Sequence, residues 1–237
     1  ALTPLGQYAP FIVLGALWLL MTIANSKAWR VLQVVSAMIE SNPAGAEEQL
    51  AAAMRVPLLS RPVRLLMYHR LALLRFRQNA FAETAAICRA VLSTRLPRPA
   101  DTVRVHLLLM YVDASLQMGN LHGAYWGLTE LRSGKLGFVE QLQCLNLQTR
   151  YELAAGYHGL ALSNLPYKLH LAEMMPAAQC GILHVLFANA ADQVHEPAVA
   201  KWLRQRADLL IGEQDVRALE FTIRNWGNPA MPPMRNF

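Results

Sequence analysis

The feature that most constrains this chain is an apolar run near its beginning, YAPFIVLGALWLLMTIANSKAWR, residues 8–30. Its first seventeen residues carry no acid or base, and the first charged side chain is that of Lys27. At a helical rise of about 1.5 Å per residue, these seventeen residues span about 25 Å, close to the hydrocarbon thickness of about 30 Å of a bilayer. Apolar residues occupy every face of residues 11–23, which is typical of a helix surrounded by lipid or by protein.

We interpret this run as a single transmembrane helix. The aromatic residues Tyr8 and Trp29 near its ends fit the two membrane interfaces, where such side chains are enriched. Two alternatives stay open: the central buried helix of a soluble regulator, and a signal peptide. A signal peptide, however, carries its basic residues before the apolar run and not after it. On the membrane interpretation, the side chains that contact lipid include Phe11, Leu14, Leu17, Trp18 and Met21.

The distribution of basic residues predicts an orientation and a division of the chain. No Lys or Arg precedes the run, whereas Lys27 and Arg30 follow it closely. The positive-inside tendency therefore places the N-terminus outside and the helical domain in the cytoplasm. We expect residues 1–27 to form the anchor, residues 28–226 a helical domain and residues 227–237 an extended tail.

The tail, NWGNPAMPPMRNF, contains three prolines and no helical period. Extended segments that contain proline lose little entropy on binding. The tail is therefore either loose or docked in a groove of a neighbouring protein. The side chains expected to dock are those of Trp226, Met231, Met234 and Phe237.

The chain from residue 28 onward has the pattern of short helices in close succession. Helix-start signals recur: Asn42 can cap a helix that begins at Pro43, and Pro176 and Pro197 can occupy first turns. The predicted fold is all-α. The expected helices are residues 10–40, 43–55, 62–77, 80–94, 101–118, 121–132, 138–155, 158–174, 176–191, 197–211 and 213–225.

Composition agrees with a large core and a surface that is poor in charge. The chain is 54% hydrophobic and 16% charged, which is a low share of charge for a soluble protein. Its three cysteines, Cys88, Cys144 and Cys180, are far apart and form no C-x-x-C motif. This pattern predicts reduced structural thiols and not a disulfide framework.

Two segments of the chain are similar to each other at an offset of 40 residues. They are LLRFRQNAFAETAAICRAVL, residues 73–92, and DASLQMGNLHGAYWGLTELR, residues 113–132. Each has the pattern of a turn followed by the second helix of a hairpin. The aligned pairs are Asn79 with Gly119, Phe81 with Leu121, Thr84 with Ala124, and Cys88 with Leu128.

This unit resembles a tetratricopeptide repeat, in which the turn carries Gly followed by a large apolar residue, and small residues let the helices approach. Gly119, Leu121 and Ala124 match that pattern, and Tyr111 holds a large position of the first helix. The resemblance implies a right-handed array of antiparallel helix hairpins, an α-solenoid that binds proteins. The chain departs from the family pattern at Val112, Leu131 and Leu136 and in its offset of 40 instead of about 34 residues. An irregular helical bundle is the alternative.

Arginines are concentrated in the segment that follows the anchor. Between residues 55 and 104 there are ten arginines and only two acids, a net charge of +8, whereas the whole chain carries +6. A step of about 100° per residue separates the arginines of residues 61–77 into two stripes. They could bind anionic lipid headgroups or an acidic partner subunit, or simply face solvent; no nucleic-acid module is present. The candidate residues are Arg61, Arg64, Arg70, Arg75 and Arg77.

Motifs that carry catalytic chemistry are absent from the sequence. There is no G-x-G-x-x-G, H-E-x-x-H or G-x-S-x-G, and the seven histidines contain no i, i+4 pair. His184 interrupts an apolar run, and we interpret it as a hydrogen-bonded core histidine. We therefore predict no catalytic, metal or cofactor site.

We expect a non-catalytic scaffold or accessory subunit, anchored in the lipid bilayer, that binds other protein subunits of a membrane complex and no nucleic acid. The alternative is a helical enzyme or cofactor-binding subunit of a respiratory or photosynthetic assembly that uses His170, His184 or the buried cysteines.

Overall fold

The structure, a computed structural model, describes residues 4–94 and 101–224. Every element in these two ranges is an α-helix, so the all-α prediction is confirmed for them. The chain divides between Arg104 and Val105 into two compact units, each described here by itself. The predicted boundary at residue 27 and the predicted tail stay predictions.

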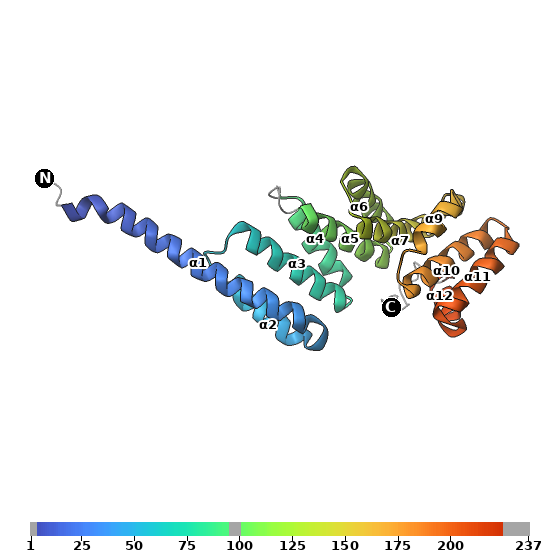
Figure 1. Cartoon of the computed structure of the whole chain (residues 1–237), viewed down its shortest axis with the longest axis horizontal. Coiled ribbons are helices and arrows are strands. Elements are labelled where there is room, and N and C mark those ends of the chain that lie inside the picture. Colours follow the sequence, from blue (N-terminus) through green and yellow to red (C-terminus); the bar gives the residue numbers. More distant parts are fainter. Residues whose placement is uncertain (1–3, 95–100, 225–237) are drawn as a thin grey trace. The chain divides into compact units, whose positions relative to one another are not determined.

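The first unit contains four helices (Figure 1). The predicted cap is present: the Asn42 side chain accepts a hydrogen bond of 3.0 Å from the amide of Gly45, and Pro43 begins the second helix. This cap satisfies one of the amides that a helix start leaves without a partner. The helices are α1, Pro4–Ser41; α2, Pro43–Met54; α3, Arg61–Arg77; and α4, Phe81–Leu92.

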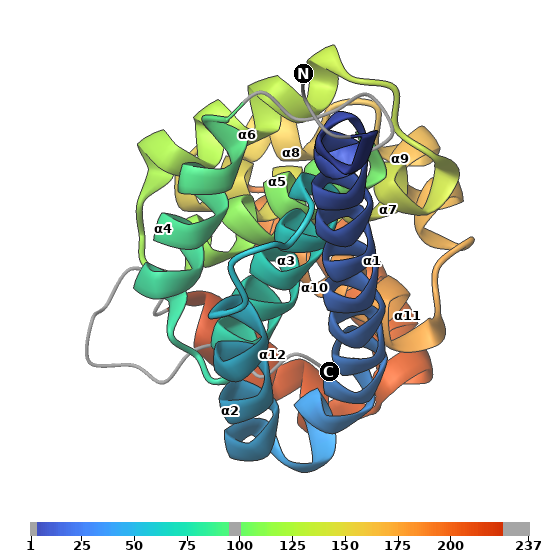
Figure 2. The ribbon, with the colours of Figure 1, turned by 90° about the vertical axis from the view of Figure 1, so that its left-hand side faces the viewer.

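The two halves of α1 have different surroundings. Residues 8–23 are exposed on every side, and in Figure 1 this half projects beyond α2 and α3. The second half buries one stripe of side chains, at i, i+4, i+7 and i+11, which is the spacing of one helix face. In Figures 1 and 2, α2 lies beside this half of the helix. The buried residues of the stripe are Ala28, Leu32, Val35 and Ile39.

These residues form one core with side chains of α2 and α3. Leu50 of α2 and Met67 and Leu74 of α3 are fully buried in it. Burial of large aliphatic side chains contributes about 1.5–3 kcal/mol each, so this cluster stabilises the three-helix arrangement. The packed half of α1 thus begins with Ala28.

Two contacts show that α3 runs alongside the second half of α1 in the same direction. The amide of Ser60, just before α3, donates to the Asn25 side-chain oxygen at 2.9 Å. At the other end of α3, Arg77 Nη2 lies 3.3 Å from Glu40 Oε1. The start of α3 is therefore at the level of Asn25, and its end is at the level of Glu40.

The second unit holds most of α5 and all later described helices. Its main core surrounds α10, in which Leu183, Leu186 and Phe187 are fully buried. Gly181 of α10 lies so close to α11 that an added Cβ would be 2.7 Å from Ile211 Cγ2. The helices are α5, Asp101–Gln117; α6, Leu121–Ser133; α7, Phe138–Ala154; α8, His158–Leu162; α9, Leu165–Ala172; α10, Ala177–Gln193; α11, Pro197–Ile211; and α12, Glu213–Arg224.

One type of turn occurs four times in the described residues. It is centred on residues with positive φ, Asn79, Gly119, Gly156 and His195, which are 40, 37 and 39 residues apart. Each turn ends a helix of 17 residues, namely α3, α5, α7 or α10. The following amide always donates to the carbonyl five residues earlier, as Ala80 does to Arg75 at 2.9 Å and Asn120 to Ser115 at 2.8 Å. This is the hydrogen-bond pattern of a Schellman motif.

A glycine on α6 lets this helix approach α5 closely. Val112 of α5 faces Gly127 of α6. An added Cβ at Gly127 would lie 2.5 Å from Val112 Cγ2, so only glycine fits without a shift. The small residue of this helix contact is therefore on the second helix of the hairpin.

The prediction of a single helix at residues 158–174 is wrong. It is divided into α8 and α9 at Asn164, which has φ 53° in the left-handed region. Lys168 compensates for the break, because its Nζ donates to the carbonyl oxygens of Leu160 and Ala161, both at 2.9 Å. Pro166 contributes to the break, since it has no amide hydrogen to continue a helix.

Candidate membrane-proximal interface

The side chains predicted to contact lipid lie on the surface of the structure. Tyr8–Ser41 is one helix that is long and apolar enough to cross a membrane, and none of its most apolar window is buried. In water, leaving each such side chain exposed forgoes about 1.5–3 kcal/mol of burial. The five predicted residues are exposed by 73% for Phe11, 62% for Leu14, 44% for Leu17, 68% for Trp18 and 37% for Met21.

Polar side chains near the end of this apolar half are satisfied within the helix. Thr22 Oγ1 donates to the Trp18 carbonyl at 2.9 Å, and Asn25 Nδ2 donates to the Met21 carbonyl at 2.8 Å. A polar side chain that bonds its own helix carries a lower penalty in a hydrocarbon environment. Asn25 also accepts from Ser60, so this residue links the exposed half of α1 to the packed unit.

Arg61 and Arg64 lie at the start of α3, close to the level of Asn25. Both are exposed. Arg64 Nη2 donates to the Leu59 carbonyl at 3.3 Å, and Arg61 has an interaction of its own within the chain. Arg64 is four residues beyond Ser60, which corresponds to about 6 Å along the helix axis. That distance is comparable to a lipid headgroup layer of about 5–8 Å.

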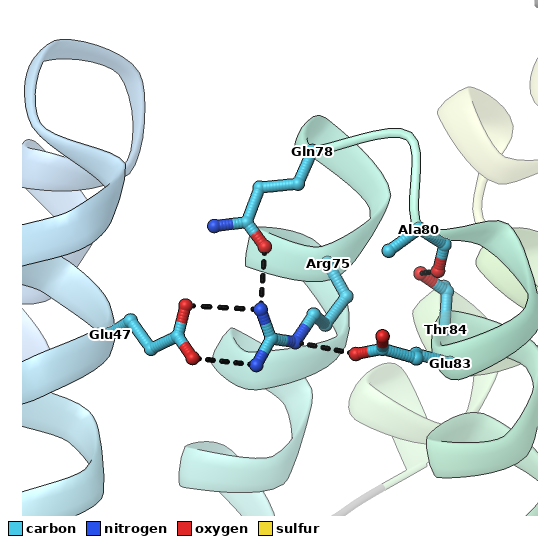
Figure 3. Close-up of polar contacts among 6 residues, drawn as sticks. All are labelled: Glu47, Arg75, Gln78, Ala80, Glu83 and Thr84. Atoms are coloured by element: carbon cyan, nitrogen blue, oxygen red, sulfur yellow. Dashed lines mark hydrogen bonds and ion pairs between the residues drawn. The ribbon is translucent and has the colours of Figure 1, made fainter.

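Arg75 and Arg77 lie at the opposite end of α3, where acidic residues bind them. Figure 3 shows Arg75 between Glu47 of α2, Gln78 and Glu83 of α4. Its Nη2 lies 2.6 Å from Glu47 Oε1, its Nη1 3.0 Å from Glu47 Oε2, and its Nε 2.8 Å from Glu83 Oε2. The bidentate hydrogen bonds raise the pKa of Arg75 and lower the pKa of Glu47. These arginines hold helices of the same unit together.

The five candidate arginines are therefore not brought together. Arg75 is fifteen residues beyond Ser60, or about 22 Å along the axis, which is more than two Debye lengths at physiological salt. Arg70 is half-buried between the two ends. The two predicted stripes describe the angle of each arginine around the helix. The position along the helix separates Arg61 and Arg64, near the level of Asn25, from Arg75 and Arg77 at the other end of α3.

An apolar groove lies between α3 and α4. It has a volume of about 390 Å³, and Arg61 and Arg64 of the first turn of α3 are among its lining residues. Helical periodicity does not predict this groove. On α3 it is lined by a second apolar face, with Leu65, Tyr68 and Leu71, besides the face that packs on α1. The remaining lining residues, all on α4 or just after it, are Ile87, Ala90, Val91 and Thr94.

A second hollow, of about 430 Å³, lies in the second unit between α6, α7 and α8. Three tyrosines line it, Tyr125, Tyr151 and Tyr157, together with Arg132 and Glu152. The Tyr125 and Tyr151 ring centroids are 6.0 Å apart. At its base Glu152 is buried and accepts from Gln148 Nε2 at 2.6 Å. Aromatic rings beside a few polar groups are common in peptide-binding surfaces.

Glu152 is also paired with a buried lysine. Lys168 Nζ lies 3.7 Å from Glu152 Oε2. Burial lowers the pKa of Lys168, and the neighbouring Glu152 carboxylate opposes this by raising it. The pair therefore holds α7 and α9 together at the hollow.

Cys180 and His184, which were considered for a catalytic or cofactor role, are buried next to each other on α10. His184 is fully buried, its Nδ1 lies 2.8 Å from the Cys180 carbonyl oxygen, and the Cys180 sulfur is 3.6 Å away. Burial lowers the pKa of His184 and raises the pKa of the Cys180 thiol, so both are neutral near pH 7. A buried neutral thiol is a poor nucleophile. The interpretation of His184 as a hydrogen-bonded core histidine agrees with this geometry.

The other cysteine and histidine candidates have no arrangement that indicates catalysis. Burial raises the pKa of Cys88 to about 12. His170 is exposed at the end of α9, and Glu173, its nearest acid in sequence, pairs with Arg206 at 2.8 Å. In residues 4–94 and 101–224, no group of three His, Cys, Asp or Glu side chains could hold a metal ion. The predicted docking residues Trp226, Met231, Met234 and Phe237 lie outside the described residues.

Comparison of the chain with protein families, with curated proteins and with solved structures finds no match.

Proposed function

We propose that this chain is a single-pass membrane protein whose helical hairpins act as a non-catalytic scaffold or accessory subunit of a membrane complex. The proposal depends mainly on the exposure of apolar side chains in the first half of α1. One continuous helix presents bare apolar side chains on every face of residues 8–23, and then packs one face into the core of the first unit. Lipid is the solvent that fits the first half, and the second half holds the domain next to it.

The recurring turn supports the scaffold role. Four 17-residue helices, each closed by the same Schellman turn at intervals of 37–40 residues, are consistent with an array of helix hairpins similar to tetratricopeptide repeats. Such arrays offer long surfaces for other proteins. The tyrosine-lined hollow of the second unit is our candidate for that contact. In this proposal the hairpins lie in the cytoplasm and the N-terminal end of α1 faces the opposite side.

The membrane part of the proposal is tested by matched charge pairs in α1. Leu14→Lys with Leu17→Lys places two charges in the apolar half, at about 2.5–3.5 kcal/mol each in a bilayer centre. Val34→Lys with Ala37→Lys places two charges at the same spacing on exposed positions of the packed half. We expect the first variant to be extracted from membranes by alkaline carbonate and the second to stay. Equal extraction of both would refute the anchor.

The scaffold part is tested on the native protein. Solubilised in a mild detergent, the 26.4 kDa chain should migrate in native electrophoresis as part of a larger assembly, with partner subunits in fixed stoichiometry. Tyr125→Ala with Tyr157→Ala should release those partners, whereas Tyr167→Ala, another exposed tyrosine of the second unit, should not. If the native chain and the variants all migrate as monomers, the scaffold role is contradicted. A stoichiometric metal or a visible chromophore in the purified chain would favour the enzymatic or cofactor-binding alternative.

A further inference from the structure

We propose that the groove between α3 and α4 binds an amphipathic helix of a partner subunit, with a carboxylate of that helix at Arg61 and Arg64 and its apolar side chains along the rest of the groove. This inference rests on the scaffold role proposed above. It adds to that role a second contact surface, in the first unit, and the chemistry of the segment that occupies it.

The groove extends from the two arginines toward the far end of α3. Its first lining residues on this helix are Arg61 and Arg64, and its last is Leu71, which corresponds to about 15 Å or almost three helical turns. The two contacts that align α3 with α1 place the arginines near the exposed apolar half of α1 and Leu71 farther from it. An acyl chain with its headgroup at the arginines would therefore be directed away from hydrocarbon, which argues against a lipid.

The walls of the groove are mostly aliphatic and aromatic. Leu65, Tyr68 and Leu71 supply the α3 wall, and Ile87 and Val91 supply much of the α4 wall. The volume of about 390 Å³ leaves room for inserted side chains. Hydrophobic grooves of this kind bind the apolar face of a helix, whose large side chains repeat at i, i+4 and i+7. Three turns of a partner helix match the length of the groove.

The charge of the groove selects an acidic partner. None of the described lining residues is acidic. Arg64 donates to a backbone carbonyl through Nη2, and a guanidinium group with five N–H donors can bind a carboxylate at the same time. The acids that pair with arginines of α3, namely Glu40, Glu47 and Glu83, lie at its other end. Residues 4–94 carry nine basic and four acidic side chains, so the described part of the first unit as a whole also attracts an acidic partner.

The lining favours a helix over an extended peptide. An extended segment needs hydrogen-bond partners for its backbone. Both walls are helices, which bond most of their own backbone groups, and apart from the arginines the described lining offers only the hydroxyl groups of Tyr68 and Thr94. Thr94 Oγ1 already donates to the Val91 carbonyl at 2.7 Å. A partner helix satisfies its own backbone and needs only side-chain contacts.

The test uses hydrocarbon-stapled helical peptides of about three turns, made in both chain directions. All carry leucines on one face of two turns, and the end turn of the same face carries two glutamates or, in the matched peptide, two lysines. Fluorescence anisotropy measures their binding to the full chain in phosphatidylcholine nanodiscs, with empty nanodiscs as the blank. We expect a glutamate peptide to bind about tenfold more tightly than its lysine counterpart, because attractive pairs replace repulsive ones. Equal binding, or no binding, would overturn the inference.

The charged end of the groove is tested by a pair of double variants. Arg61→Gln with Arg64→Gln should weaken binding of the glutamate peptide about fivefold, since each exposed ion pair contributes up to about a factor of five. Arg55→Gln with Arg89→Gln removes the same charge from exposed positions outside the lining and should weaken binding less than about twofold. If the two double variants behave alike, the inference is wrong.

The apolar part is tested by two variants of α4. Ala90→Phe fills the groove from an exposed position and keeps both arginines. It should weaken binding about fivefold or more without a change in the helical circular dichroism. Ala82→Phe, at an exposed position of the same helix outside the lining, should not. Equal affinity for an unstapled, proline-interrupted peptide of the same composition would show an extended occupant and overturn the helix.

The scaffold role and this inference fail separately. A chain that migrates in native electrophoresis as part of a larger assembly but binds no glutamate peptide keeps its scaffold role and has no helix site at the groove. A monomeric chain that binds no peptide contradicts both. A dimer of the chain that Ala90→Phe abolishes would assign the groove to a second copy and overturn the partner helix.

Discussion

The two halves of α1 are both apolar and both helical, yet only one of them belongs to a core. In the second half, Lys27, Arg30, Gln33 and Glu40 lie on exposed faces and the buried stripe lies between them. In the first half no polar face exists, and none of the described helices of the unit covers it (Figure 1). The difference shows that mean hydropathy does not distinguish a helix that buries one stripe from a helix that is apolar all round. The presence or absence of a polar face does.

The largest expected effect comes from an acid placed in each half. Val35 is fully buried, so Val35→Asp puts a carboxylate into the core of the first unit without a partner. We expect a loss of about 4 kcal/mol or more in the free energy of unfolding, enough to unfold that unit. Leu17→Asp, measured in the same detergent by the same denaturant titration, should leave the unit folded. Equal losses would mean that both halves are packed alike.

A smaller effect is expected from truncation without charge. Leu32→Ala leaves a cavity against α2 and α3 and should cost about 2–4 kcal/mol. Leu14→Ala removes the same atoms from an exposed position and should cost less than about 0.5 kcal/mol in detergent. Thermal unfolding followed by circular dichroism checks both. A large loss at Leu14 would show that the first half has a protein partner within this chain.

The junction between the halves is tested at Asn25. Asn25→Ala removes the oxygen that accepts from the Ser60 amide and should cost about 1 kcal/mol. Amide hydrogen exchange should then become faster at Ser60 and in the first turn of α3, while the end of α3 keeps its protection. Unchanged exchange at Ser60 would contradict the role of Asn25 as the link.

The smallest effect concerns the ion pair that holds α2 to α3 beside the packed half. Arg75 lowers the pKa of Glu47, so the pair contributes stability that is fully present above the unfolded pKa of about 4.5 and is lost as pH falls through the lower folded value. Because Glu47 is 38% exposed, we expect only about 0.5–1 kcal/mol. The difference between the native chain and Glu47→Gln should be constant above pH 5.5 and shrink toward pH 3. A difference that grows at low pH would contradict this assignment.

Local chemistry allowed part of the fold to be predicted. Asn42 and Pro43 start α2 as expected, because capping depends only on neighbouring residues. The repeat at offset 40 was visible because Asn79 and Gly119 both tolerate a left-handed conformation. The turn at His195 was not predicted, since histidine is a less obvious residue for a positive φ.

The candidate site was predictable only in outline. Helical periodicity correctly separates Arg70 from Arg75 by angle, but the partner of Arg75, Glu47, is 28 residues away in sequence and comes close only through the packing of α2 on α3. The groove was not predictable for the same reason. One wall is α3 and the other is α4, and neither sequence alone indicates a space between them.

No proline follows Pro10 within α1, and the helix continues unbroken to Ser41. The exposed half and the packed half of α1 are thus parts of one rod and are not joined by a flexible linker. The sixteen residues beyond Asn25 extend about 24 Å, so a change of about 20° in the tilt of the rod would move their far end sideways by about 8 Å. In the membrane proposal, a change in bilayer thickness that tilts the exposed half would therefore move the packed helices of the first unit.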